Sequence, residues 1–145
     1  MSCVISQFYT DLLLALDRGD KPAVITREGV YTYAQLRRAT GNIHSHLKGL
    51  SGRILITFTG KTLDSYATVL AALLSNVIWV PLSAAQPLHR NQHIISTIKP
   101  ALLLYDSTIS NDLLEFVKKN NIEATHILET TLGPDQIRLP KIERN

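Results

Sequence analysis

Apolar residues in the second half of the chain follow one repeating unit. Short, continuously apolar runs rich in β-forming residues begin near positions 53, 77, 101 and 125, a step of 24 residues. Stretches with helical spacing separate them, and no sequence repeat underlies the period. Continuously apolar strands that alternate with helices are typical of a parallel sheet covered on both faces. Because crossovers are right-handed, we expect an α/β fold with a doubly wound, Rossmann-like or flavodoxin-like sheet.

The same pattern gives approximate bounds for these elements. We expect strands at 54–58, 77–80, 101–105 and 125–128, and helices at 62–74, 87–99 and 110–119. The segment 62–74 is apolar on nearly every side, which predicts a deeply buried helix, and we expect the strand at 77–80 to be buried as well. Pro87 is the expected first residue of its helix, and Ser110 is the expected N-cap of the last one.

A helix and a hairpin are predicted ahead of the sheet. Residues 5–18 place apolar side chains at three- and four-residue steps, the pattern of an amphipathic helix. Two short apolar runs, 22–26 and 30–32, then flank a turn that contains Gly29. Glycine supplies the positive φ that a tight turn requires, so we expect a short β-hairpin here.

A second helix follows the hairpin directly. Thr32 and Gln35 have the spacing of a capping box, and Gly49 follows as a helix stop. The expected buried stripe consists of Leu36, Ala39, Ile43 and Leu47. We assign 1–129 to one α/β subdomain, and 130–145, which contains a glycine and two prolines, to a loop or linker tail.

Composition and charge exclude several classes of protein. Hydrophobic residues make up 45% of the chain and charged residues 19%, so the chain can bury a core. The net charge of +3 is dispersed, and the longest basic runs are the pairs Arg37-Arg38 and Lys118-Lys119, so we expect no nucleic-acid partner. One cysteine, Cys3, excludes a disulfide framework and a zinc site built on several cysteines.

Neither a membrane span nor a secretory signal is predicted. The uncharged stretch from Ser65 to Leu88 is interrupted by Ser75-Asn76 and Pro81, whereas a transmembrane helix needs about 20 apolar residues in one run. The N-terminus lacks a basic region followed by an apolar core and a cleavage site. We therefore expect a cytoplasmic protein without a membrane span.

Ligands of doubly wound sheets bind beyond the carboxyl ends of the strands, so these ends are the places to look for chemistry. Gly60-Lys61-Thr62 follows the first strand, but a phosphate-binding loop needs two glycines and only one is present. We interpret Thr62 as the N-cap of the next helix. Ser83 follows the second strand without a neighbouring base, and we interpret it as a turn residue.

Asp106 follows the third strand, the position of the phosphate acceptor in receiver domains. Such a domain also needs acidic residues after its first strand to hold magnesium, and none follow Phe58. We therefore favour a turn or cap aspartate over a phosphoacceptor.

The histidines do not predict a metal site. His89 and His93 have metal-ligand spacing on a helix, but Arg90 stands where a zinc hydrolase needs glutamate, and no third ligand is evident. We expect these side chains on a solvated helix face. His44 and His46, two residues apart, point to different sides of their helix. We assign no catalytic, cofactor-binding or metal-binding residue.

Three stretches, 21–36, 63–74 and 74–90, together resemble the N-terminal region of adenylate-forming enzymes. This superfamily includes acyl-CoA synthetases, adenylation domains of nonribosomal peptide synthetases and luciferases. The third stretch is similar to a family signature that contains Val-Pro-Leu-Asp-Pro. Positions that match in register are Pro81, Leu82, Pro87 and Arg90. The resemblance covers residues 5–106, and its ordered motifs agree with the predicted elements.

Three positions at two sites depart from the family pattern. Ser75-Asn76 replaces Ala-Gly, and Ser83 replaces an aspartate. Asparagine is the next best residue for a left-handed helix end, so we expect the local geometry to survive.

The resemblance implies the N-terminal part of a ligase that activates a carboxylic acid as an acyl adenylate and transfers it to a thiol. ATP and magnesium are implied for the complete enzyme. Its other partners would be the remainder of the enzyme, in cis or in trans, and a carrier protein or CoA. In the family, a Ser/Thr/Gly-rich loop ending in Pro-Lys-Gly, a ribose-binding aspartate and a late lysine do the chemistry. None has a counterpart here, so we expect no catalysis by this chain alone.

Two alternatives remain open at this point. The chain could be a freestanding non-catalytic binding module on the same scaffold, or a receiver-like regulator that acts through Asp106. The acid is also open, because fatty, aryl and amino acids fit the resemblance equally.

Overall fold

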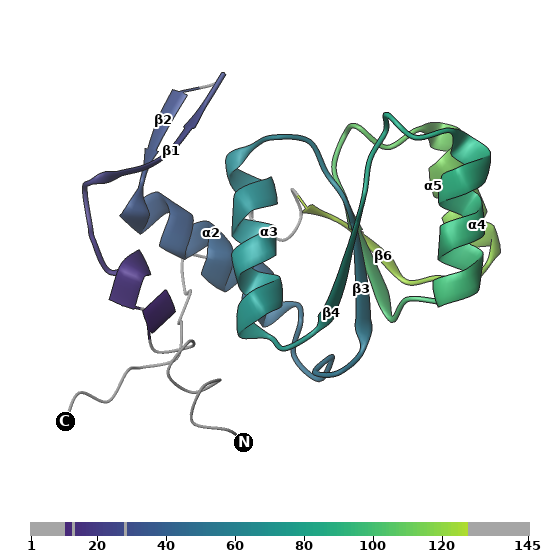
Figure 1. The fold of residues 1–145 in the computed structure, drawn as a ribbon, viewed down its shortest axis with the longest axis horizontal. Helices are drawn as coiled ribbons and strands as arrows, with labels where there is room; N and C mark the ends of the chain where they lie inside the picture. Colours follow the sequence, from purple (N-terminus) through teal and green to yellow (C-terminus); the bar gives the residue numbers. More distant parts are fainter. Residues whose placement is uncertain (1–10, 13, 28, 128–145) are drawn as a thin grey trace.

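The computed structural model describes residues 11–12, 14–27 and 29–127 (Figure 1). In chain order, the elements are β1 Pro22–Thr26, β2 Gly29–Thr32, α2 Tyr33–Ser45, β3 Ile54–Phe58, α3 Leu63–Leu74, β4 Ile78–Leu82, α4 Leu88–Ile98, β5 Leu102–Tyr105, α5 Asn111–Lys119 and β6 Ala124–His126. Residues 11, 12 and 14–16 are helical as predicted, whereas the rest of the predicted N-terminal helix before residue 11 and the tail 130–145 lie outside the described residues.

Four parallel strands form the central sheet in the order β4-β3-β5-β6. The chain moves outward from β3 to β4 and then reverses to β5 and β6. With right-handed crossovers, this reversal puts α3 on one face of the sheet and α4 and α5 on the other. Figure 1 shows that arrangement, with α2 beside α3. The fold is therefore the predicted doubly wound α/β sheet, with the flavodoxin-like strand order.

Each face of the sheet has its own apolar core. Leu55 and Leu104 point to the face covered by α2 and α3, where Ile43 and Ala71 meet them. The neighbouring strand residues point the other way and pack against α4 and α5 in a cluster that consists of Ile56, Phe58, Leu82, Ile95, Leu103, Leu113 and Val117. Successive residues of a strand face opposite sides of a sheet, so continuously apolar strands supply both cores.

The N-terminal elements confirm the local predictions. β1 and β2 form an antiparallel hairpin, and Gly29 at its turn has a φ of +148°. The Thr32 side chain accepts a hydrogen bond from Gln35 N, and the Gln35 side chain accepts one from Thr32 N, which completes the capping box of α2. The predicted stripe is buried at Leu36, Ala39 and Ile43 of α2, and also at Leu47 in the turn that follows the helix.

The predictions of burial for α3 and for the second strand were wrong in part. α3 buries one side, but Tyr66 and Leu73 on its other side are exposed. β4 is an edge strand, so its Ile78 and Trp79 side chains keep 54% and 37% of their surface exposed. An apolar run indicates that a strand packs against helices on the faces of the sheet. Whether the strand also has a neighbouring strand on each side depends on the strand order.

Helix ends agree with the sequence only in part. The first helical stretch ends at residue 16 and not at 18, and α2 ends at Ser45, with His46 as its C-cap, before the predicted stop at Gly49. Asn76 has a φ of +54° just after α3, so asparagine does adopt the left-handed conformation there. Pro87 is the N-cap of α4 and not its first residue. Lys99 ends α4 at a φ of +52°, which the sequence did not indicate because lysine has no special preference for that conformation.

Candidate functional site

The strand order identifies the place where a ligand would bind in a sheet of this kind. From β3 the chain adds β4 on one side and then β5 and β6 on the other, so the strand order reverses between β3 and β5. Ligands of open α/β sheets bind at the carboxyl ends of the strands at such a switch point. Two segments meet at this point: the loop after β3, which contains Gly60, and the turn after β5, which begins with Asp106.

The protein's own side chains fill the switch point. Asp106 Oδ2 accepts a hydrogen bond from Gly60 N at 2.7 Å. Asp106 Oδ1 accepts from Thr108 N at 2.9 Å and from Thr108 Oγ1 at 2.5 Å. A Cβ atom on Gly60 would lie 3.3 Å from Thr108 Cγ2, which is a tight contact. The two loops are thus joined directly by a hydrogen bond and a close contact.

This geometry supports the turn interpretation of Asp106 and argues against the phosphoacceptor. Both carboxylate oxygens are engaged by backbone and hydroxyl donors, whereas a phosphoacceptor needs an oxygen free for attack. The hydrogen bond between Asp106 and Gly60 was not predicted from the sequence, because the two residues are 46 positions apart. Only the strand order brings them together.

The segment after Gly60 caps a helix, as predicted. The Thr62 side chain accepts from Ser65 N at 3.3 Å, and Ser65 Oγ accepts from Thr62 N at 2.9 Å, so α3 begins with a reciprocal capping box. A phosphate loop needs several backbone N–H groups that converge on the anion. Here the backbone donors of Gly60, Thr62 and Ser65 already have protein acceptors, and the Lys61 side chain is exposed.

Ser83 is a turn residue, also as predicted. Its hydroxyl accepts from Ala85 N at 3.1 Å. Its carbonyl oxygen accepts from Gln86 N at 3.2 Å and from the side chain of Asn91, which is buried, at 3.1 Å. No sequence pattern indicated Asn91, which joins α4 to the end of β4.

The histidines do not come together. His89 and His93 lie exposed on α4, as expected, and no group of three potential metal ligands occurs in the described part of the chain. His44 is half-buried near Lys48. Burial is the larger cause, and the positive charge of Lys48 the smaller one, of a pKa of His44 below its ordinary value.

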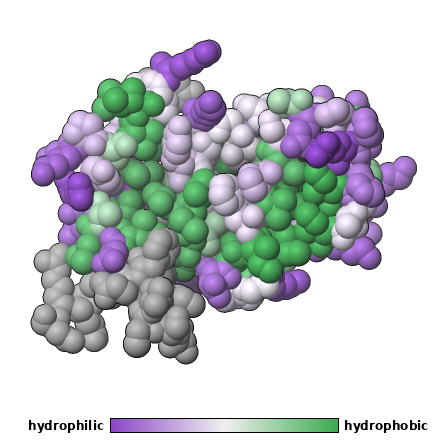
Figure 2. Space-filling view, viewed as in Figure 1, coloured by the Kyte–Doolittle hydropathy of each residue, from purple (hydrophilic) through white to green (hydrophobic). Residues whose placement is uncertain are grey.

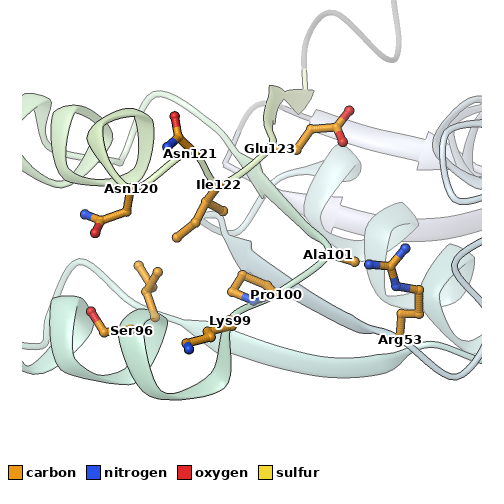
Figure 3. A pocket seen from close by; sticks show the side chains of 10 residues that line it. Arg53, Ser96, Lys99, Pro100, Ala101, Asn120, Asn121, Ile122 and Glu123 are labelled. Carbon is orange, nitrogen blue, oxygen red and sulfur yellow. The ribbon is translucent and has the colours of Figure 1, made fainter.

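One open groove lies at the opposite edge of the sheet. It has a volume of about 570 Å³ and lies between the C-terminal ends of α4 and α5, beside the amino ends of the strands (Figure 3). Arg53, Lys99 and Glu123 give its rim both signs of charge, and Ile95, Pro100 and Ile122 are among its apolar residues. This is not the edge at which doubly wound sheets bind ligands, and its lining holds no nucleophile with an adjacent base.

No helix within the described ranges is both long enough and apolar enough to span a bilayer.

Comparison with known sequences gives the family. The model of the AMP-binding enzyme family matches residues 15–143. The chain is 27% identical over 138 residues to the hybrid PKS-NRPS synthetase traA of Penicillium crustosum, which covers 91% of this chain and 3% of that protein. It is 31% identical over 99 residues to nonribosomal peptide synthetase 5 of Gibberella zeae, which covers 65% of this chain and 1% of that protein.

Solved structures agree on the fold. The apo structure of MatB from Rhodopseudomonas palustris superposes with a TM-score of 0.75 at 19% identity, over 94% of this chain and 30% of that one. A luciferase-like enzyme from the Zophobas morio mealworm gives a TM-score of 0.70 at 17% identity, over 94% of this chain and 37% of that one. The chain spans only a small part of each relative. Since the family model covers most of its residues, this chain belongs to the AMP-binding enzyme family.

Proposed function

We propose that this chain is the N-terminal structural layer of an ATP-dependent adenylate-forming ligase, and that it does not catalyse adenylation alone. The complete enzyme would activate a carboxylic acid as an acyl adenylate and transfer the acyl group to a thiol. Family membership supports the chemistry. The small share of each relative that the chain spans, 3% of the Penicillium synthetase and 30% of MatB, supports the assignment as a part.

The closed switch point is the observation on which the proposal rests. Asp106 and Thr108 occupy the place where a doubly wound sheet would hold a ligand, and the donors of the Gly60 loop are bonded within the protein. These residues therefore stabilise the scaffold. The groups that bind ATP and magnesium would come from the remainder of the enzyme, in cis or in trans.

The relatives also bear on the substrate. Two of them are described as nonribosomal peptide synthetases or a hybrid of that class. Among fatty, aryl and amino acids, this similarity favours an amino acid, and a carrier-protein thiol over CoA as the acceptor. We propose a cytoplasmic location for the complete enzyme. Cell fractionation with an antibody to the chain tests that location.

Two tests of the proposal use the gene and the longer protein that we expect it to encode. We expect the reading frame beyond the codon for Asn145 to continue into a Ser/Thr/Gly-rich loop that ends in Pro-Lys-Gly. The longer protein should then catalyse ATP–pyrophosphate exchange with at least one amino acid, and replacing the lysine of that loop by alanine should lower the exchange. A longer protein that folds but shows no carboxylate-dependent exchange would contradict the ligase function.

A further inference from the structure

Among the residues that the structure describes, no strand pairs with the outer side of β4. Ile78 N donates to Arg53 O at 2.8 Å, and Ile78 pairs in register with Ile54. Backbone groups of successive residues in a strand point alternately to the two sides. The amides of residues 78, 80 and 82 therefore face β3, and those of Trp79 and Pro81 face outward.

Pro81 occupies one of the two outward positions of β4. Proline has no N–H group, and its ring stands where a neighbouring strand would place a carbonyl oxygen. A strand that approached this edge would find the Trp79 amide but no second donor from β4. Proteins commonly use proline at edge strands in this way to prevent unwanted pairing.

Apart from Pro81, the outer edge of β4 has properties that promote pairing with another β-strand. Its side chains Ile78 and Trp79 are β-formers and remain 54% and 37% exposed. Figure 2 shows hydrophobic surface in the region between β4 and α4. The Trp79 indole donates from Nε1 to Thr57 Oγ1 at 2.8 Å, which holds this side chain against β3. The edge is therefore apolar and held in place, as a template for another strand would be.

We propose that Pro81 keeps β4 as the outermost strand by preventing a β-strand of a second copy of this chain from pairing with it. In an antiparallel pair of two β4 strands, each copy would lack the donor at position 81, so carbonyl groups of its partner would stay without a hydrogen bond. The inference concerns this chain's own geometry, and it stands whether or not the chain is part of a ligase.

Hydrogen exchange of the unmodified full chain tests the open edge directly. The Val80 amide faces β3 in the register of the two strands and should be protected. The Trp79 amide should exchange at least about tenfold faster, because no strand within the described ranges pairs with its side of β4. A Trp79 amide protected as well as that of Val80 would show that something pairs with this edge, and would overturn the proposal.

Two substitutions test the role of the proline. Pro81→Thr restores an N–H group in a strand-forming residue, and Pro81→Lys restores the same N–H group together with a charge that opposes edge pairing. We expect sedimentation velocity to give Pro81→Thr a dissociation constant at least about tenfold lower than those of the wild type and Pro81→Lys, which should match each other.

Trp79 is the only tryptophan in the chain, so its emission reports on β4 itself. It should shift to the blue with rising concentration of Pro81→Thr and not with Pro81→Lys. Equal association of the two variants would overturn the proposal. The exchange measurement needs no substitution, so it decides the question even if Pro81→Thr fails to fold.

Discussion

Asp106 joins the loops that follow β3 and β5 through both oxygens of one carboxylate. Its bond to Thr108 is local, and an aspartate at the end of a strand predicts a turn of that kind. Its bond to Gly60 depends on β3 and β5 being neighbours, which no local pattern shows. At the scale of single residues, the sequence therefore predicted that Asp106 is a turn residue. It could not predict that Asp106 joins the loop after β3 to the turn after β5.

Replacing Asp106 should weaken the fold measurably. Asp106→Ala removes the acceptors of Gly60 N and of both Thr108 donors, so we expect the free energy of unfolding to fall by about 1–3 kcal/mol. Urea denaturation measures it. Asp112→Ala, at an exposed site in the first turn of α5, is the matched control and should cost less than about 1 kcal/mol. Equal losses in the two variants would show that the junction contributes no stability.

His44 should make stability depend on pH. Its pKa is lowered in the folded state, first by burial and then by Lys48, so the unfolded chain binds the proton more readily. Stability from this group is therefore present above its ordinary pKa of 6.5 and is lost as the pH falls below that value. In urea denaturation between about pH 7.5 and 5.5, the wild type should lose more stability than His44→Gln. Parallel profiles of the two proteins would contradict the assignment.

Elements were predicted well where the signal is local. Helix caps depend on residues about three apart, and the predicted capping box at Thr32 and the predicted N-cap at Thr62 both form. The regular spacing of strands likewise predicted the sheet and its strand–helix order. Strand order within the sheet is a long-range property, so β4 was expected to be buried and proved to be an edge. The exposed side of α3 was missed for the same reason.

The start of α3 allows a test that separates capping from ligand binding. Thr62→Ala removes the side-chain acceptor of Ser65 N, and we expect a loss of about 1 kcal/mol in the free energy of unfolding. Lys61→Ala changes an exposed neighbouring side chain and should stay within about 0.5 kcal/mol of the wild type. If instead Lys61→Ala abolished binding of ATP by the chain, the loop would be a phosphate site after all.

The molecule also exposes apolar side chains outside the four-stranded sheet, on the hairpin of β1 and β2. Ile25 and Val30 face each other across the hairpin and are 77% and 59% exposed. Monomeric proteins rarely expose connected apolar groups without a partner. Such exposure suits a layer that packs against further parts of an enzyme, and it suits a stable freestanding module less well.

The hairpin should therefore promote self-association of the isolated chain. We expect the wild type to self-associate in sedimentation velocity, and the double variant Ile25→Thr, Val30→Thr to do so less. Threonine keeps the strand preference, and both positions are largely exposed, so stability should change by less than about 1 kcal/mol. A wild type that is a clean, stable monomer at all concentrations would favour the freestanding module.

ATP–pyrophosphate exchange by this chain alone tests the central claim most directly. Amino, aryl and fatty acids would each be supplied with ATP, magnesium and labelled pyrophosphate, with the buffer and the chain without acid as controls. The filled switch point predicts no exchange above these controls with any acid. Carboxylate-dependent exchange that purifies with the chain would show that the residues present form an adenylation site, and would contradict the account.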